Sequence, residues 1–275
     1  MRRFGLNGAT TGTADLMTDL RAAREAGYDV LEIRDAKLQA YLDAGGSLES
    51  LHKALSEAGV KAASLNALER STLATGTAHE DVLERCRTLC AWAEAIECPY
   101  VVAVPSVLTE PLPWDRVRAL TIEALQAMAV VARPRGVRIG FEFLGFASCS
   151  VNTLAAARDV VDGIADPGVG LVIDAFHFYV GRSTWQMLDE LSPDQLFLVH
   201  LDDAEDRPAV ELTDAHRLLP GDGVIPLREF VRRIEGLGYR GLYSIELFRP
   251  EYYEWDPVEL ARVARVKMEA LFSDS

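Results

Sequence analysis

The sequence predicts a (β/α)8 barrel, and three observations carry this prediction. Short apolar runs of strand type alternate along the whole chain with longer stretches of helical periodicity. No linker or change of composition divides the 275 residues, an ordinary size for a barrel built as one domain. The turn after the first run, Gly8-Ala-Thr-Thr-Gly12, lacks the glycine pattern of the phosphate-binding turn in an open doubly wound sheet. We therefore expect residues 1–275 to form a single TIM-barrel domain.

Eight segments are expected to form strands, because each is a short run rich in β-branched, aromatic or leucine side chains. Near-continuous apolar runs of this kind are typical of parallel strands that are covered on both faces. In chain order the expected strands are residues 3–7, 28–34, 60–67, 100–104, 138–145, 170–174, 196–200 and 242–246.

Eight helices are expected to follow these strands. Several have clear boundaries: Ser47 is a good N-cap residue, and Gly27 and Gly59 are typical of the position just after a helix end. Pro134 ends the fourth helix, since proline cannot continue the hydrogen-bond ladder. The expected helices are residues 13–26, 47–59, 79–97, 114–133, 152–164, 184–191, 226–237 and 257–272.

Composition is that of a globular cytoplasmic protein. The formal net charge of −14 argues against nucleic acid and against anionic membranes as partners, because both attract basic surfaces. No apolar run reaches the ~18 residues of a membrane span, and no secretory leader is expected before the first strand. Four cysteines in a chain of this length do not make a disulfide framework. We expect a cytoplasmic protein that acts on a small molecule.

Four consecutive strands each carry one polar residue of metal-ligand type within or at the end of an apolar run. These residues are Glu142, Asp174, His200 and Glu246. A buried carboxylate costs several kcal/mol unless a cation or hydrogen-bond donors meet it. In a barrel the carboxyl ends of the strands meet at one face, where active sites lie. The four side chains therefore predict a site for one divalent ion, with Mn²⁺ or Zn²⁺ favoured and Mg²⁺ or Co²⁺ also suited to oxygen-rich ligands.

Two further residues are candidate substrate contacts. His177 follows Asp174 by three residues, and Arg217 lies on the loop after the strand that ends at His200. A guanidinium at this place can stabilise negative charge that develops on a substrate oxygen. Alternatively, His177 and Arg217 are side chains that face solvent and have no function in a site. Each of the four metal candidates, taken singly, could likewise be a buried residue that only forms an ion pair or a hydrogen bond.

The loops after the seventh and eighth strands are acidic. Barrels that bind phosphorylated substrates usually build the phosphate site from these loops. Few glycine amides are present to hold a dianion there, and Arg249 is the cation that would favour one. We therefore expect a substrate without a phosphate. The acidic residues are Asp202, Asp203, Glu205, Asp206, Glu251, Glu254 and Asp256.

The order of the candidate ligands, Glu, Asp-x-x-His, His and Glu on successive strands, resembles that of the xylose isomerase-like sugar isomerase/epimerase superfamily. Within it, the chain is similar to the inosose isomerases (2-keto-myo-inositol isomerases) of inositol catabolism. The run after the last strand is the most specific part of the likeness, because such a run seldom recurs by chance. The matching segments are Asn7, Ala9-Thr-Thr11, Glu32-Ile-Arg34, Leu65-Asn-Ala-Leu68, Tyr100-Val-Val-Ala-Val-Pro105, Phe141-Glu-Phe143, Val151-Asn-Thr153, Asp174-Ala-Phe-His-Phe178, His200-Leu-Asp-Asp203, Leu212-Thr-Asp214 and Glu246-Leu-Phe-Arg-Pro-Glu-Tyr-Tyr253.

The resemblance implies an isomerase that moves a ketone along a cyclic polyol, from 2-keto-myo-inositol to 1-keto-D-chiro-inositol, through an enediolate. It also implies that the four candidate ligands bind one divalent ion, and that His177 and Arg217 contact the polyol ketone. Glu142 and Glu246 are then the candidate pair for proton transfer, because such chemistry needs carboxylates on either side of the reacting plane. Which of the two removes the proton stays open, and so does the oligomeric state, a homo-oligomer included.

Other functions remain open at this point. Within the superfamily they are a ketose 3-epimerase, a hydroxypyruvate isomerase or an inosose dehydratase. A DNA-repair endonuclease of the same superfamily would need more metal ligands and a basic groove, whereas the chain has five histidines and an excess of acidic residues. From another class comes a barrel that binds a metal or a sugar without catalysis.

Overall fold

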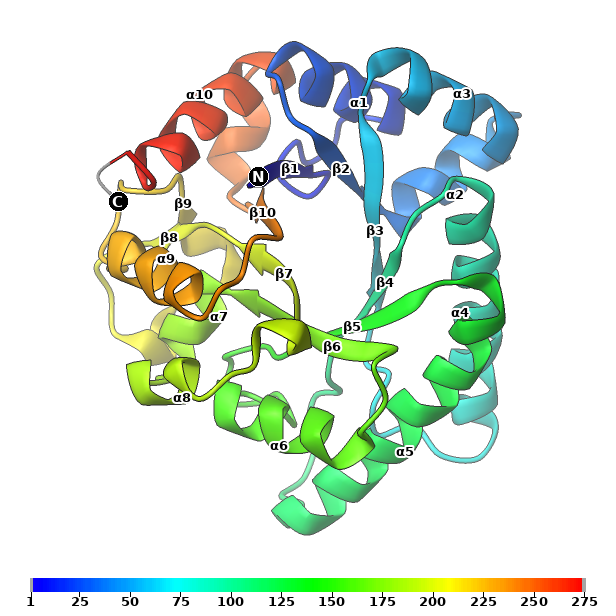
Figure 1. Ribbon diagram of the computed structural model, residues 1–275, viewed down its shortest axis with the longest axis vertical. Coiled ribbons are helices and arrows are strands. Elements are labelled where there is room, and N and C mark those ends of the chain that lie inside the picture. Colours follow the sequence, from blue (N-terminus) through cyan, green and yellow to red (C-terminus); the bar gives the residue numbers. More distant parts are fainter. Residues whose placement is uncertain (1, 274–275) are drawn as a thin grey trace.

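The computed structural model describes residues 2–273 and contains a closed barrel of eight parallel strands (Figure 1). Each strand pairs with its neighbours in chain order, and the last strand closes the barrel against the first. The predicted barrel is therefore confirmed. Its strands are β1 (Arg3–Asn7), β2 (Val30–Arg34), β3 (Lys61–Leu68), β4 (Tyr100–Ala103), β5 (Arg138–Glu142), β6 (Val169–Asp174), β7 (Leu196–His200) and β10 (Leu242–Ile245).

An outer ring of helices covers the barrel (Figure 1). Eight of them correspond to the expected helices, although α1 begins at Leu16 rather than residue 13, because Asp15 caps it by accepting a hydrogen bond from Thr18 N. Ser47 caps α3 as expected, and Gly59 ends it with a φ of 69°. These helices are α1 (Leu16–Glu25), α3 (Leu48–Ala58), α4 (Thr77–Ala95), α5 (Trp114–Ala132), α6 (Leu154–Ile164), α8 (Trp185–Asp189), α9 (Leu227–Gly236) and α10 (Pro257–Ala270).

The structure adds two helices that the sequence analysis did not predict. Helix α2 (Asp35–Asp43) follows β2 directly, and it buries little more than Leu38, so it has almost no apolar stripe. Helix α7 (Ala175–Val180) follows β6 directly and has only six residues, too few to show a helical period. The short 3₁₀ helices are η1 (Arg133–Arg135), η2 (Pro193–Gln195), η3 (Ala209–Glu211), η4 (Asp214–His216) and η5 (Pro250–Glu254).

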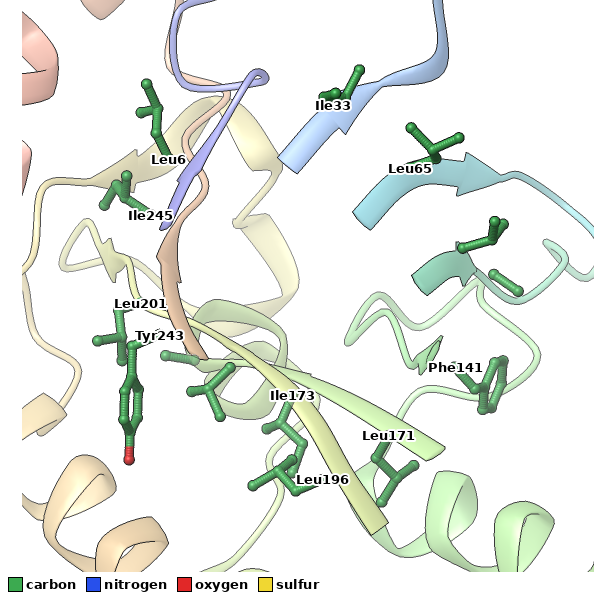
Figure 2. Close-up of a cluster of buried hydrophobic side chains, with 14 of the residues drawn as sticks. Leu6, Ile33, Leu65, Phe141, Leu171, Ile173, Leu196, Leu201, Tyr243 and Ile245 are labelled. Atoms are coloured by element: carbon green, nitrogen blue, oxygen red, sulfur yellow. The ribbon is translucent and has the colours of Figure 1, made fainter. Parts of the chain in front are cut away.

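Alternate residues of each strand face the two sides of the barrel wall, which produces two apolar layers. The larger layer fills the space between strands and helices and includes Leu6, Ile33 and Phe141 (Figure 2). A smaller cluster closes the barrel interior near the strand starts; its members are Val30, Ala63, Val102, Val172, Phe197, Leu198 and Leu242. The interior positions further along the strands are polar, so the chemistry of the barrel is confined to its carboxyl-end face.

A small hairpin shapes this face. Strand β8 (Asp203–Ala204) pairs antiparallel with β9 (Arg217–Leu218), where the sequence analysis expected a loop. Asp203 holds the connection together, because its buried carboxylate accepts hydrogen bonds from the backbone N–H groups of Gly221 at 3.0 Å and Ile225 at 2.8 Å. The hairpin therefore delivers Arg217 to the barrel mouth from a defined backbone.

Two further observations concern the cysteines and the helices. All four cysteines are free and buried. Among the residues that the structure describes, no helix combines the length and the apolar character needed to cross a membrane.

Gly140 provides a test of the interior packing, because it lies two residues before Glu142 on β5 and so faces the same side of the barrel wall. A Cβ added there would lie 2.8 Å from Val172 Cγ2. We expect Gly140→Ala to lower the free energy of unfolding by about 1–3 kcal/mol, as overpacking does, measured by denaturant unfolding. The control is Gly236→Ala in α9, where an added Cβ meets nothing within 4 Å. Equal losses in the two variants would contradict this packing.

Candidate metal centre

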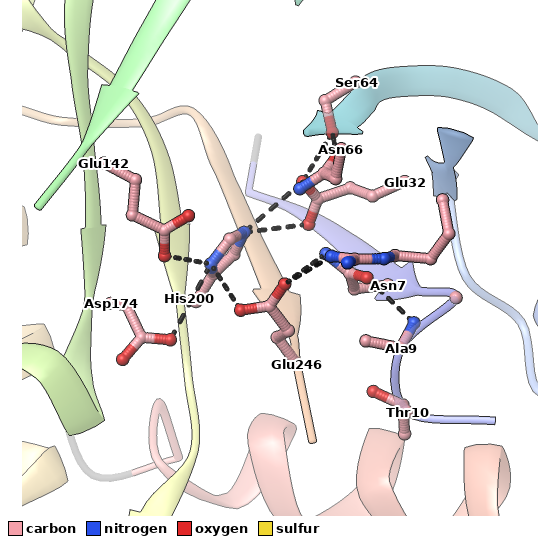
Figure 3. A network of polar contacts seen from close by, with 12 residues as sticks. Asn7, Ala9, Thr10, Glu32, Ser64, Asn66, Glu142, Asp174, His200 and Glu246 are labelled. Carbon is pink, nitrogen blue, oxygen red and sulfur yellow. Dashed lines mark hydrogen bonds and ion pairs between the residues drawn. The ribbon is translucent and has the colours of Figure 1, made fainter. Parts of the chain in front are cut away.

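The four predicted ligands meet at the carboxyl-end face of the barrel (Figure 3). Glu142, Asp174 and His200 are the last residues of β5, β6 and β7, and Glu246 follows β10 directly. The sheet register places Asp174 beside His200. All four side chains are buried, and each offers a ligand atom within 4.8 Å of the others. The barrel thus brings together residues from four strands, of which the first and last, Glu142 and Glu246, lie more than a hundred positions apart.

His200 lies at the centre of the cluster. Its Nδ1 atom is 3.2 Å from Glu142 Oε1, 3.3 Å from Glu246 Oε2 and 3.8 Å from Asp174 Oδ2. Its Nε2 atom faces away from these groups, toward Glu32. Burial alone lowers the pKa of this imidazole, but the surrounding carboxylates of Glu32, Glu246 and Glu142 outweigh burial and raise it well above its usual value.

The two glutamates of the cluster differ in their electrostatic environment. Burial raises the pKa of Glu142 to about 7, and the negative charges of Glu246 and Asp174 add to this effect. Burial acts on Glu246 in the same direction, but His200, Arg217 and Arg34 outweigh it and lower the pKa of Glu246 to about 2. The pKa of Glu142 is therefore raised toward neutral pH, whereas that of Glu246 is lowered so that its carboxylate stays ionised.

Glu246 has supports that the sequence analysis missed. The side chain of Asn7 donates a hydrogen bond to Glu246 Oε1 at 2.9 Å, and Arg34 Nη1 lies 3.9 Å from the same oxygen. The other oxygen, Oε2, faces His200. Asn7 and Arg34 are the last residues of β1 and β2. Their positions at the carboxyl ends of barrel strands could have indicated from the sequence that they belong to the site.

Arg217 is buried beside the cluster rather than exposed on a surface. Its Nη1 group lies 2.5 Å from Asp174 Oδ2 and 2.6 Å from Asp202 Oδ2, and its Nε donates to Asp214 at 3.0 Å. The guanidinium carbon lies 4.9 Å from the ring centre of Phe176, an arrangement that favours a cation. These contacts hold one orientation of the side chain and raise its pKa well above the usual value, against the effect of burial.

His177 is buried in α7 and depends on Arg217. Asp174 caps this helix: its Oδ1 accepts a hydrogen bond from the backbone N–H of His177 at 2.7 Å. Arg217 Nη2 donates to His177 Nε2 at 3.0 Å, so Nε2 accepts and the ring proton lies on Nδ1. Burial lowers the pKa of this imidazole, which agrees with a neutral ring.

A cavity of about 240 Å³ opens onto the cluster, and Glu142, Glu246, His177 and Arg217 all line it. None of the acidic residues named above for the loops after the seventh and eighth strands lines this cavity. Asp202 is buried against Arg217, and Glu205 is paired with Arg249 at 2.6 Å, so both support the structure. The wall also includes Arg34, Asn66, Leu144, Val104, Asp214 and Phe248.

Comparison with known proteins agrees with this geometry. The family model for xylose isomerase-like TIM barrels matches residues 20–271. The chain belongs to this family. Within the family it is similar to the inosose isomerase of Halalkalibacterium halodurans, with 34% identity over 261 residues that cover 94% of this chain and 92% of that protein. The inosose isomerase of Bacillus subtilis is 33% identical, with 94% of each chain covered. The resemblance expected from the sequence is confirmed.

A solved structure gives the same result. The crystal structure of the IolI protein with a bound zinc atom matches this chain with a TM-score of 0.96 and 32% sequence identity, and the match covers 98% of both chains. The likeness to this xylose isomerase-like barrel therefore extends over nearly every helix and strand.

The residues of this xylose isomerase-like barrel fit a divalent cation. Three carboxylates and one imidazole nitrogen form a compact, buried donor set. Carboxylates packed this closely repel each other, and a cation between them removes the repulsion. Oxygen atoms with one imidazole suit Zn²⁺, Mn²⁺, Co²⁺ or Mg²⁺ and do not suit the soft metals that thiolates select.

The donor set predicts about one divalent ion per chain, lost when a ligand is removed. His200→Ala and Asp174→Asn should each lose the ion, because a three-ligand remainder binds it weakly. Elemental analysis after chelation, reloading and desalting measures the content. His52→Ala is the control, since His52 lies on α3 in a separate cavity with Arg3 and Lys61. Full metal content in either ligand variant would remove that residue from the centre.

Proposed function

We propose that this protein is a divalent-metal-dependent inosose isomerase that moves a ketone to the neighbouring carbon of a cyclic polyol. The observation that carries the proposal is that Glu142 and Glu246 both approach His200 Nδ1 (Figure 3). Both glutamates also line one cavity. Similarity to inosose isomerases over nearly the whole chain supports the choice of substrate.

Glu142, Asp174, His200 and Glu246 would hold the ion. The crystal structure of the similar IolI protein contains a bound zinc atom. When bound, a divalent ion acts as a Lewis acid that polarises the ketone and makes the neighbouring proton easier to remove. The protein side chains then have to move that proton from one carbon to the next.

Glu142 and Glu246 are the groups proposed to move the proton. The ketone shift removes a proton from the carbon that bears the neighbouring hydroxyl and returns one to the former carbonyl carbon. The proton of that hydroxyl is lost as the new carbonyl forms, and the former carbonyl oxygen gains one, so no oxidant or reductant is needed. An ionised carboxylate is required to accept the proton, and an acid is required to return it. The carboxyl groups of Glu142 and Glu246 both line the cavity, so each is placed to act as the base or as the acid.

Arg217 and His177 are proposed as substrate contacts. Arg217 keeps its charge because burial is offset by Asp174, Asp202 and Asp214. Such a fixed cation at the cavity wall stabilises negative charge on a substrate oxygen without having to reorient. His177 lines the same cavity, and its hydrogen bond from Arg217 fixes the plane of the ring.

The cavity supports a small polyol as the substrate. Leu144, Val104 and Phe248 offer apolar surface to ring carbons, while Arg34 and Asn66 offer donors to hydroxyl groups.

The free cysteines are typical of a reducing compartment, and we therefore propose that the enzyme works in the cytoplasm. With a net charge of −14, the chain is unsuited to nucleic acid as a partner.

The proton-transfer roles predict the effect of two conservative variants. Glu142→Gln and Glu246→Gln should each lower turnover by at least ~100-fold, because removal of a general acid or base costs this much or more. Steady-state kinetics on metal-loaded protein measures the loss.

The control for these variants is Glu69→Gln, since Glu69 lines the same cavity but lies outside the four-ligand cluster. It should keep turnover within about tenfold of the parent protein, a loss below the usual range for an acid or base. Metal content is matched in every sample. Parental turnover in a fully loaded Gln variant would exclude that glutamate from proton transfer.

The substrate prediction is tested by competition among ketones. We expect interconversion of 2-keto-myo-inositol and 1-keto-D-chiro-inositol, with solvent deuterium entering the carbons next to the carbonyl. NMR spectra in D₂O compare both inososes with fructose, tagatose, psicose and hydroxypyruvate at equal concentration. A higher kcat/KM for a free ketohexose would replace the proposal by a ketose 3-epimerase. Binding of an inosose without any deuterium exchange would indicate a non-catalytic barrel.

A further inference from the structure

A further carboxylate, Glu32 on β2, contacts His200 from the side opposite the cluster (Figure 3). The two oxygens of Glu32 lie 3.1 and 3.3 Å from His200 Nε2. Both side chains have no exposed surface. Glu32 is separated from His200 by 168 positions in the chain, so the contact exists only in the closed barrel.

Glu32 is held in place by the next strand. Ser64 on β3 donates its hydroxyl proton to Glu32 Oε2 at 2.6 Å, and Asn66 Nδ2 lies 3.5 Å from the same oxygen. Glu32 is fully buried and does not line the cavity. Its direct partner among the candidate metal ligands is His200.

The chemistry of imidazole gives this contact a consequence. A neutral ring has one N–H group and one lone pair, and it binds a metal through the lone pair. His200 turns Nδ1 toward Glu142, Asp174 and Glu246, and it turns Nε2 toward Glu32. A carboxylate that accepts a hydrogen bond from Nε2 holds the proton there and leaves the lone pair on Nδ1, where the other ligands are.

We propose that Glu32 is a positioning residue that fixes the tautomer and ring plane of His200 and thereby sets the affinity of the four-ligand cluster for its divalent ion. The inference rests on the proposed function only in that the cluster binds a metal. It goes further by assigning to a residue outside the donor set, and outside the cavity, control over how tightly the ion is held.

A purely structural role for Glu32 makes a different prediction. In that case its replacement lowers stability, and any loss of metal follows from the loss of stability alone. Ile33 supplies a matched comparison: it is the next residue on β2, it is equally buried, and it belongs to the layer between the strands and helices. A variant of Ile33 therefore perturbs the same strand without touching His200.

The experiment compares Glu32→Gln with whichever of Ile33→Val or Ile33→Ala loses a similar amount of thermal stability. Chelated protein is titrated with Zn²⁺ or Mn²⁺ in a calorimeter, without substrate. We expect Glu32→Gln to weaken binding about 10–100-fold, the usual effect of removing a partner of a metal-binding histidine. The Ile33 variant should stay within about threefold of the parent protein, because the partners of His200 are unchanged.

A second variant covers the case in which Glu32→Gln fails to fold. Ser64→Ala removes the hydrogen bond that orients Glu32 but keeps its charge. It should weaken metal binding by a smaller factor, about two- to tenfold, because the carboxylate is still present but less well aimed.

NMR spectra of ¹⁵N-histidine-labelled protein report the tautomer directly. The chain has five histidines, and His200→Gln identifies the signals of His200. In the metal-loaded parent protein we expect the proton on Nε2 in a strong hydrogen bond, and in Glu32→Gln a weakened hydrogen bond at that atom.

The outcomes separate this inference from the proposed function. If the parent protein binds the ion and Glu32→Gln binds it equally well, the role of Glu32 is wrong and the isomerase proposal stands. The role is also wrong if Glu32→Gln and the matched Ile33 variant lose affinity equally. If the parent protein binds no divalent ion, both proposals fail.

Discussion

The main constraint on this barrel is the concentration of negative charge around one buried imidazole. Four carboxylates surround His200 with little access to water, on strands that enter the barrel from different parts of the chain; they are Glu32, Glu142, Asp174 and Glu246. Ionised groups taken out of water need compensation, and removing one partner leaves the others uncompensated. The polar residues at the carboxyl-end face supply this compensation, whereas the apolar cluster near the strand starts closes the barrel interior.

The compensation comes from elements outside the cluster. Arg217 arrives on the β8–β9 hairpin and reaches Asp174 and Glu246, while Arg34 arrives at the end of β2. Asp203 makes the hairpin possible by binding backbone groups of the following loop. The hairpin thus belongs to the electrostatics of the site as much as to its shape, since without it the cluster would lose its buried guanidinium.

The sequence predicted the residues that interrupt an apolar run and missed those whose role depends on partners across the barrel. The sequence predicted the four candidate ligands because a polar side chain in a buried apolar run needs a partner; they are Glu142, Asp174, His200 and Glu246. Glu32 carries the same signal, but its partner is 168 positions away and cannot be found from spacing. The two-residue strands β8 and β9 are too short to show a periodic pattern. The structural roles of Asp202 and Asp203 could not be predicted either, because their arginine and backbone partners are visible only in three dimensions.

Asp174 links three tasks in one side chain. One oxygen caps α7 through the backbone of His177, and the other faces His200 and Arg217. The spacing of Asp174 and His177 is therefore constrained. An insertion between them would remove the cap of α7, and it would displace either Asp174 from the four-ligand cluster or His177 from the cavity wall. The connection between β8 and β9 carries no such double duty along most of its length, and Val210 within it is largely exposed. A change of length near Val210 would leave the spacing of Asp174 and His177 unchanged, because surface loops tolerate insertions better than capped helix ends.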